Sequence, residues 1–265
     1  MEETSPLAAE LPALAAKLPA LAAKLPALAA VICAAGTSSR MGGVKKEFCI
    51  CNADKVPGGI NFPRITVLGN AVRTFASVPS IKTIVIVIPE NSEESARAAL
   101  MPEHLPKVIF VNGGKTRRAS VFNALSLLEE HSPRYVLIHD GARPWVSVSL
   151  IESIFEAVKK HGAVIPLLPL TDTPKECDTP LEFGHQGVAQ PVFIKNHLKR
   201  KNTGIAQTPQ AFRFPEILSA HKQAAALEND EFTDDAEIWG RFCGPVAVIP
   251  GEPENRKITF KEDLQ

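Results

Sequence analysis

The sequence predicts an α/β protein with an open, doubly wound sheet of mostly parallel strands. From Ala29 onward, short apolar segments alternate with segments of helical spacing, and this alternation is typical of repeated βαβ units. Most of the apolar segments are aliphatic on both faces, as expected for strands buried between two layers of helices. We recognise one hydrophobic core in this pattern, so residues 29–265 are predicted to form a single domain.

The strands are predicted from apolar runs of four to seven residues, at Ala29–Ala35, Thr83–Ile88, Val108–Val111, Tyr135–His139, Ala163–Leu168 and Val246–Ile249. Helical spacing predicts helices between or after them, at Val67–Phe75, Ser92–Leu100, Ala119–Glu130, Ser149–Lys160, Pro215–Leu227 and Thr233–Phe242. Ligands of such sheets bind at the carboxyl ends of the strands. The residues just after each strand are therefore the first candidates for chemistry.

Residues 1–28 are predicted to be a low-complexity extension outside the domain, or an interaction tail. Residues 11–30 repeat the unit LPALAAK almost perfectly, but each unit carries a proline, which inside a helix costs about 3 kcal/mol and argues against a coiled coil. Acidic residues at the start and two lysines within the apolar stretch argue against a secretory signal. No run reaches the roughly 18 apolar residues of a membrane span, so we expect no membrane partner.

Two other segments break the alternation. Residues 170–207 carry scattered charge, glycines and several prolines, and such a long excursion within a compact domain is usually functional or mobile. We therefore expect an arm there. Residues 52–64 look like an insertion that forms a surface loop, and we assign it no role.

The composition excludes several classes of protein. A hydrophobic share of 45% argues against a disordered, collagen-like or membrane-spanning chain. The 29 basic and 29 acidic residues balance, which argues against a general nucleic-acid partner but leaves room for a small anionic ligand. The five cysteines have no metal-ligand spacing. We expect them to be reduced thiols in a cytoplasmic protein.

The first predicted strand runs into a candidate phosphate-binding loop. It ends in AAGTSSRM (residues 34–41), followed by Gly42, Gly43, Lys45 and Lys46. Small residues let backbone N–H groups approach phosphate oxygens, and the basic side chains supply positive charge. The loop has neither the G-K-[ST] of a Walker A motif nor G-x-G-x-x-G. A tight turn with solvated lysines is the alternative.

Two further strand ends carry candidate residues. The segment HDGARP (139–144) contains an Asp at the end of a central strand, which can bind a divalent cation beside phosphates. An Asp140–Arg143 ion pair that caps the next segment is the alternative, and His139 is expected at the edge of the core. The segment GGKTRRASV (113–121) has two glycines that would let a flat base approach the backbone. Gly-Gly before a helix is also commonly just a turn.

These three segments together resemble the 2-C-methyl-D-erythritol 4-phosphate cytidylyltransferase family. The later segments Asp172-Thr173, Thr208-Pro209-Gln210, Thr233-Asp234-Asp235-Ala236 and Asn255-Arg256-Lys257-Ile258-Thr259 fit in the same order, so the resemblance covers about residues 30–265. It implies a Rossmann-like nucleotidyltransferase domain with a protruding β-arm at 170–207 and a homodimer formed through that arm. The implied reaction transfers a cytidylyl group from CTP to 2-C-methyl-D-erythritol 4-phosphate and releases pyrophosphate, in non-mevalonate isoprenoid biosynthesis.

The resemblance also implies roles for single residues. The implied catalytic residues are Arg40 and Lys46, which would hold the triphosphate, and Lys257, which would stabilise the α-phosphate. The implied nucleotide-binding residues are Ala34, Ala35, Gly36, Gly114, Lys115, Ser120, Asp140, Ala142 and Arg143, with Mg²⁺ or another divalent cation on Asp140. The implied binding residues for the acceptor are Asp172, Thr173, Arg200 and Thr208, with the arm reaching across a dimer interface.

Two departures and two alternatives accompany the resemblance. Ser38 stands where the family often has glycine, and the loop is expected to survive if this residue keeps a negative φ. Lys115 stands where an acidic residue is frequent. A cytidylyltransferase for another polyol phosphate, such as ribitol 5-phosphate, would share the nucleotide half, although Thr173 and Arg200 favour methylerythritol phosphate. The second alternative is a non-catalytic nucleotide-binding scaffold, which would not need metal-binding and α-phosphate groups together.

Overall fold

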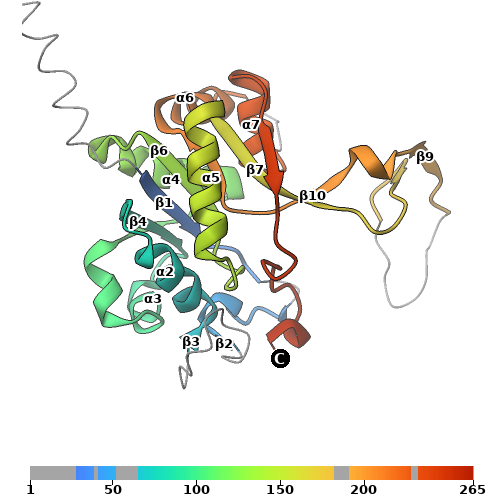
Figure 1. Cartoon of the computed structure of the whole chain (residues 1–265). Coiled ribbons are helices and arrows are strands. Elements are labelled where there is room, and N and C mark those ends of the chain that lie inside the picture. The colour runs from blue at the N-terminus through green and yellow to red at the C-terminus, as the bar shows by residue number, and fades with distance from the viewer. Residues whose placement is uncertain (1–27, 39–40, 52–64, 182–190, 228–231, 265) are drawn as a thin grey trace, which may run out of the picture.

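The computed structural model of the chain describes residues 28–38, 41–51, 65–181, 191–227 and 232–264 (Figure 1). The repeat at residues 11–30 therefore lies almost entirely outside the described residues. The same holds for the insertion at 52–64 and for the predicted phosphate-binding residue Arg40. Among the described residues, no helix has both the length and the apolar character needed to cross a lipid bilayer.

An eight-stranded sheet forms the centre of the described fold. Strand β1 (Leu28–Cys33) is parallel to β4 (Ile81–Ile88) on one side and to β6 (Tyr135–Asp140) on the other. Strand β5 (Val108–Asn112) continues the parallel part beyond β4. The register places Cys33 beside Asp140, so the first loop and the acidic loop begin next to each other.

The other half of the sheet is mixed. Strand β11 (Gln210–Arg213) lies between β6 and β7 (Ala163–Pro169) and is antiparallel to both. Strand β10 (Gly204–Ala206) pairs antiparallel with β7, whereas β12 (Ala247–Pro250) pairs parallel with it. The sheet order is thus β10-β7-β11-β6-β1-β4-β5, with β12 beside β7.

Helices cover both faces of the sheet, as Figure 1 shows. One face packs against α2 (Val67–Ser77), α3 (Glu93–Ala98) and α5 (Val148–His161), and the other against α4 (Arg117–Leu128), α6 (Phe214–Ala225) and α7 (Asp235–Phe242). Successive residues of β1 point to opposite faces, as the pleat of a strand requires: Ile32 packs in the first layer and Val31 in the second. The predicted α/β fold with a mostly parallel central sheet is confirmed.

Short elements complete the fold. Strands β2 (Ile50–Cys51) and β3 (Ile65–Thr66) pair antiparallel beside α2, and 3-10 turns lie at Lys46–Phe48, Pro102–Lys107, Glu129–His131, Arg200–Asn202 and Lys261–Leu264. The sequence pattern does not predict β11. This strand is only four residues long, but Ala211 and Phe212 are fully buried in it, because it fills the centre of the mixed half.

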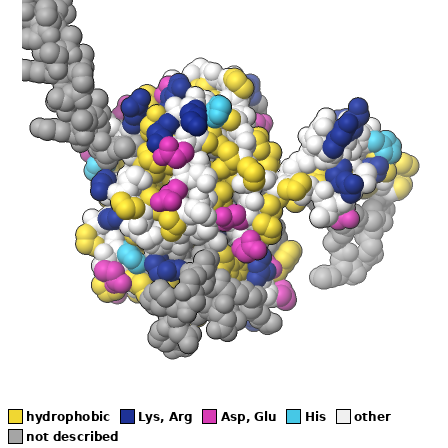
Figure 2. All heavy atoms as spheres, viewed as in Figure 1, with side chains coloured by type: hydrophobic (Ala, Val, Ile, Leu, Met, Phe, Trp, Pro, Cys, Tyr) yellow, Lys and Arg dark blue, Asp and Glu magenta, His cyan; other side chains and the backbone are white. Residues whose placement is uncertain are grey.

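The chain leaves the sheet after β7 and returns through β10. Between them, β8 (Lys175–Cys177) and β9 (Ile194–His197) form a separate two-stranded antiparallel sheet. Figure 2 shows this arm joined to the body by a narrow neck, with hydrophobic and basic side chains on its surface. Phe193 and Ile194 on the arm are 64% and 52% exposed.

Candidate active site

The carboxyl ends of the central strands bring the three predicted loops to one edge of the sheet. The backbone N–H of Gly141 donates to the Cys33 carbonyl at 2.9 Å, and that of Gly113 donates to the Ile88 carbonyl at 2.8 Å. These bonds extend the strand pairing into the loops, which enclose a cavity of about 340 Å³. The predicted site residues in its lining are Ala35, Gly36, Lys46, Gly114, Lys115, Ser120, Asp140, Ala142 and Lys257. Predicted Ala34 lies just behind, fully buried.

The Gly-Gly turn supports one wall of this first cavity. The Gly114 N–H donates to the Ser120 hydroxyl at 3.0 Å. A Cβ atom on Gly113 would lie 2.5 Å from the Cβ of Ala35, which is closer than real carbon atoms approach. Glycine is therefore required for the third loop to pack against the first, and Ser120 holds the turn as well as lining the cavity.

The first loop turns back on itself in a left-handed conformation. The condition placed on Ser38, a negative φ, is not met: its φ is +51°, and Gly42 and Gly43 also have positive φ. The reason is a tight turn in which the Ser38 carbonyl accepts the Gly43 N–H at 3.3 Å. The turn returns Lys45 to the start of the loop, where its ammonium group donates to the Gly36 carbonyl.

Lys46 is directed into the first cavity from the end of this loop. Its side chain is almost fully buried, and its Nζ donates to the Ile258 carbonyl at 2.9 Å. The Ile258 N–H in turn donates to the Ala142 carbonyl at 2.8 Å. Lys257, the preceding residue, is therefore held at the same cavity although it lies more than 200 positions further along the chain.

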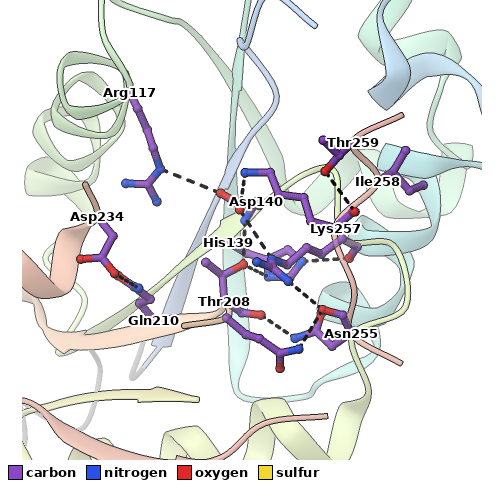
Figure 3. Close-up of polar contacts among 12 residues, drawn as sticks. Arg117, His139, Asp140, Thr208, Gln210, Asp234, Asn255, Lys257, Ile258 and Thr259 are labelled. Carbon is purple, nitrogen blue, oxygen red and sulfur yellow. Dashed lines mark hydrogen bonds and ion pairs between the residues drawn. The ribbon is translucent and has the colours of Figure 1, made fainter. Parts of the chain in front are cut away.

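Asp140 lies at the centre of a cluster of cations (Figure 3). Its carboxylate is 2.9 Å from Lys257 Nζ, 3.5 Å from Arg143 Nε and 3.9 Å from Arg117 Nε. Burial alone would raise the pKa of Asp140, but Lys257, Arg117 and Arg143 together hold its pKa well below the usual range. Asp140 is therefore ionised at neutral pH, and the alternative of an Asp140–Arg143 pair describes only part of its contacts.

A second cavity of about 300 Å³ adjoins the first. Arg117, Asp140 and Lys257 line both cavities, so the Asp140 cluster forms their common wall. The second cavity also contains the predicted residues Arg143 and Thr208. Two anionic ligands could therefore meet at a wall that carries a net positive charge.

The match to known families decides the assignment. The family model described as "IspD: 2-C-methyl-D-erythritol 4-phosphate cytidylyltransferase" matches residues 28–265. The chain belongs to this family. The family predicted from the motifs is thereby confirmed, and IspD is an enzyme family of cytidylyltransferases.

Other IspD sequences and structures resemble the chain over most of its length. It is 36% identical over 198 residues to the "Bifunctional enzyme IspD/IspF" of Bartonella tribocorum, covering 75% of this chain and 46% of that protein. It is 34% identical to the protein of the same name from Brucella anthropi, covering 89% and 53%. The chain thus spans about half the length of these relatives. The 4-diphosphocytidyl-2C-methyl-D-erythritol synthase of Anaerococcus prevotii superposes with a TM-score of 0.69 and 28% identity, covering 89% of this chain and 92% of that one.

The IspD fold also fixes the tautomer of His139. This histidine is fully buried in the core, and its Nε2 lies 3.0 Å from the Arg143 carbonyl, so Nε2 must carry the proton. Its Nδ1 then accepts from the Thr208 hydroxyl at 3.0 Å. The same hydroxyl accepts the Asp140 N–H at 3.0 Å. Burial lowers the pKa of His139 to about 4, so it is neutral and acts as a structural support of Asp140.

A network of amide side chains holds the segment that carries Lys257. The Gln207 Nε2 donates to the Glu252 carbonyl at 2.8 Å, and its Oε1 accepts the Glu252 N–H at 3.0 Å. The Asn255 Nδ2 donates to the Thr208 carbonyl at 2.7 Å, as Figure 3 shows. The C-terminal segment is thereby attached to the wall of the second cavity.

The predicted acceptor-binding residues of the arm lie apart from both cavities. Asp172, Thr173 and Arg200 are exposed, and none of them lines either of the two cavities. Arg200 donates to the Thr171 carbonyl at 2.6 Å. Of the predicted acceptor residues, the structure brings only Thr208 to the Asp140 cluster.

Sequence reasoning assigns no role to several polar residues that lie in or behind the site, among them Arg117, Gln207, Gln210 and Asp235. The sequence could have indicated Asp235 and Gln210, because both stand within segments that match the family. For Arg117 the indication is weaker: it belongs to a basic pair shortly after Gly-Gly. Nothing in the local sequence distinguishes Gln207, whose side-chain hydrogen bonds are with residues 45 or more positions away.

The donor set of the site fits a metal ion that is shared with phosphates. Among the described residues, no group of three or more His, Cys, Asp and Glu side chains could hold a metal ion alone. Mg²⁺ in nucleotide sites commonly takes one or two carboxylates and completes its shell with phosphate oxygens and water. Asp140, ionised and at the common wall of the two cavities, matches that requirement.

Proposed function

We propose that this chain transfers the cytidylyl group of CTP to 2-C-methyl-D-erythritol 4-phosphate. The observation that carries the proposal is the ionised Asp140 with three cations at the common wall of the two cavities. Nucleotidyl transfer brings two polyanions together, and its catalysis depends on positioning and on fixed positive charge. The membership of the chain in the IspD family supports the same reaction.

The step forms one bond and breaks one. A phosphate oxygen of the acceptor attacks the α-phosphorus of CTP, and the bond from the α-phosphorus to the bridging oxygen breaks. Pyrophosphate leaves with that electron pair, and the product is 4-diphosphocytidyl-2-C-methyl-D-erythritol. A phosphate monoester is largely ionised at neutral pH because its second pKa is about 6. No general base is therefore required.

Residues of the first cavity would bind CTP. The cytosine would lie against the Gly-Gly turn, near Ala35, Gly114, Lys115 and Ser120, with Ala34, Gly36 and Ala142 shaping the floor. Lys46 would bind the triphosphate, and Lys257 would exchange its contact with Asp140 for one with the α-phosphate. Arg40, which lies outside the described residues, stays a predicted triphosphate ligand.

Asp140 would hold Mg²⁺ together with phosphate oxygens. The ion would supply charge neutralisation on the phosphates as pyrophosphate leaves. Within the chain, the position of Asp140 is supported by His139 and Thr208 behind it. Arg143 donates from NH1 to the Asn255 carbonyl at 2.8 Å, which favours a fixed guanidinium beside the ribose and the metal.

Residues of the second cavity would bind the acceptor. Thr208 is in its lining, and Asp172, Thr173 and Arg200 would complete it from the arm of a second copy. Two features support a homodimer: these three arm residues line neither cavity of their own chain, and the arm exposes large apolar side chains. All five cysteines are free thiols, which favours a cytoplasmic location.

Pyrophosphate release tests this proposal. The full chain is incubated with CTP and Mg²⁺ and with methylerythritol phosphate, ribitol 5-phosphate or no acceptor. We expect release with the first acceptor and little with the other two. Release with ribitol 5-phosphate instead would identify the related polyol enzyme. No release with either acceptor, in a folded protein that binds CTP, would indicate a nucleotide-binding scaffold.

A further inference from the structure

A fully buried acid lies directly behind the Asp140 cluster. Asp235, the first residue of α7, and His221 of α6 have no exposed side-chain surface. Asp235 Oδ1 is 3.2 Å from His221 Nε2, and Asp235 Oδ2 is 2.8 Å from Arg117 NH1. Among the described residues, the linings of the two cavities include neither Asp235 nor His221, and the ion pair with Arg117 links this acid to a residue that lines both.

Arg117 connects the buried acid to the site. It is the first residue of α4, where a cation lies unfavourably at the positive end of the helix dipole. A cation in this place needs a compensating partner, and Asp235 supplies one. The planar guanidinium uses NH1 for Asp235, while its Nε faces Asp140 at 3.9 Å. The rigid, planar fork of donors can contact two carboxylates in a fixed geometry, whereas the ammonium group of a lysine sits on a flexible stem and does not preset that geometry.

The cations around Asp140 differ in how firmly they are held. Lys257 has a flexible stem and a 40% exposed side chain, and its ammonium group has Asp140 as its carboxylate partner. Arg117 also pairs with the buried Asp235. On the same helix, the Phe122 ring stacks on the His221 ring, with 6.5 Å between the ring centroids. When Lys257 turns toward a phosphate, Arg117 is therefore still anchored beside Asp140.

We propose that Asp235 is a positioning residue, which anchors Arg117 so that Arg117 keeps Asp140 oriented while Lys257 engages the α-phosphate. His221 holds the second oxygen of Asp235 and fixes the orientation of its carboxylate. The inference rests on the proposed function, because it assigns Asp235 to the same transfer reaction. The three residues come from three helices: Arg117 from α4, His221 from α6 and Asp235 from α7.

The anchor is tested first without turnover, by NMR of the arginine Nε–Hε groups in ¹⁵N-labelled protein. The Arg117 signal is assigned by its loss in Arg117→Lys. We expect a rigid signal in the parent, with a heteronuclear NOE like that of the helical backbone, and a mobile signal in Asp235→Asn or Asp235→Ala. An Arg117 signal that is equally rigid in both variants would overturn the anchor.

The consequence for catalysis is tested by a double-mutant cycle on kcat and KM. Small misplacements of reacting groups cost up to about 100-fold in rate, so we expect kcat to fall about tenfold or more in Asp235→Asn and in Arg117→Lys, with the KM for CTP changed less than about threefold. Because Asp235 acts through Arg117, the double variant loses no more than the worse single variant. Losses that multiply would contradict the proposal.

Lys222→Gln provides the matched control. It lies next to His221 on α6 and removes an exposed ion pair with Glu129, so kcat should not change. If Asp235→Asn fails to fold, Arg117→Lys carries the test, and an unchanged kcat there would overturn the inference. If the parent itself releases no pyrophosphate, the proposed function fails, and the NMR comparison still tests the anchor separately.

Discussion

The Lys46 ammonium group donates a 2.9 Å hydrogen bond to the carbonyl oxygen of Ile258. This bond joins the first loop to the segment that carries Lys257, so two lysines far apart in the sequence face one cavity. Their proximity is maintained by backbone contacts at both ends, because the Ile258 N–H also binds the Ala142 carbonyl. The packing of the loops therefore fixes the positions of both positively charged side chains in the ligand-free protein.

Lys257→Ala is expected to lower kcat by about 10²–10³ with folding intact, which is the loss typical of one preorganised donor. The Lys257 side chain is 40% exposed and Asp140 keeps Arg143 and Arg117 as neighbours, so the loss of this ion pair should lower stability only modestly. Steady-state pyrophosphate release and thermal unfolding measure the two effects separately. Near-normal turnover would remove Lys257 from the catalytic residues.

Lys46→Ala is expected to lose at least as much activity, again with a native fold. It also leaves the Ile258 carbonyl without this donor, which costs about 1–3 kcal/mol for a buried acceptor. The variant should therefore unfold at a lower urea concentration than Lys257→Ala. A Lys46→Ala protein that is as stable as Lys257→Ala and turns over normally would contradict both the contact and the role.

Ser38→Gly should be tolerated, whereas Ser38→Val should not. A left-handed backbone at an L-residue costs about 1–2 kcal/mol, and a β-branched side chain is the least compatible with it. The affinity for CTP should be unchanged in Ser38→Gly and weaker in Ser38→Val, as measured by calorimetric titration. Equal affinity of both variants would argue against the positive φ of this residue.

The pH dependence of stability should reflect the buried His139. Its pKa in the folded chain, about 4, lies below its ordinary value of 6.5. The fold therefore favours the neutral ring, and its contribution is complete above pH 6.5 and is lost as the pH falls from about 6.5 to about 4, on the order of 3 kcal/mol. Asp140 and Asp235 have lowered pKa values, so their contributions are lost at still lower pH.

The measurement is the free energy of urea unfolding of the parent and of His139→Gln between pH 4 and 7. The difference between the two proteins should shrink toward acid pH, because in the parent the unfolded chain gains a proton at His139 that the buried ring does not accept. Burial raises the pKa of Glu47, so this residue makes the free energy of unfolding change with pH in the opposite direction. Its effect is the same in both proteins and cancels in the difference. A constant difference across this range would show that His139 is not the responsible group.

Asn255→Ala is expected to reduce kcat more than about tenfold by loosening the segment that carries Lys257. Asn255 is fully buried and donates to the Thr208 carbonyl at 2.7 Å. Loss of this anchor displaces reacting groups, to which rates are sensitive. A parallel decrease in thermal stability is expected, so the diagnostic reading is kcat at a temperature where the variant is fully folded. Unchanged kcat there would assign Asn255 to stability alone.

The sequence pattern predicts the parallel half of the sheet well. Its strands are apolar runs buried on both faces, and they alternate with segments of helical spacing. Strand β1, with alternate residues in opposite layers, and β4 are aliphatic on both faces, and their neighbours are joined by ordinary crossover helices. Strand β11 is different. It is four residues long and antiparallel at the centre of the sheet, and its burial depends on partners that local periodicity does not identify.

The site divides in a similar way. Lys46, Asp140 and Lys257 follow strand ends or stand in motif segments, so sequence reasoning could expect them at the cavity that all three line. Arg117 and Asp235 form their ion pair across two helices, and no local pattern encodes such a meeting of side chains. The positive φ of Ser38 likewise depends on the closure of the whole loop rather than on the residue itself.

Label transfer from [α-³²P]CTP tests the central claim most directly. The parent and the Asp140→Asn variant are incubated with Mg²⁺ and 2-C-methyl-D-erythritol 4-phosphate, and the labelled products are separated. We expect label in 4-diphosphocytidyl-2-C-methyl-D-erythritol with the parent, and at least about a 100-fold slower transfer with the folded variant. No labelled product from the parent, or equal rates in both proteins, would contradict the account.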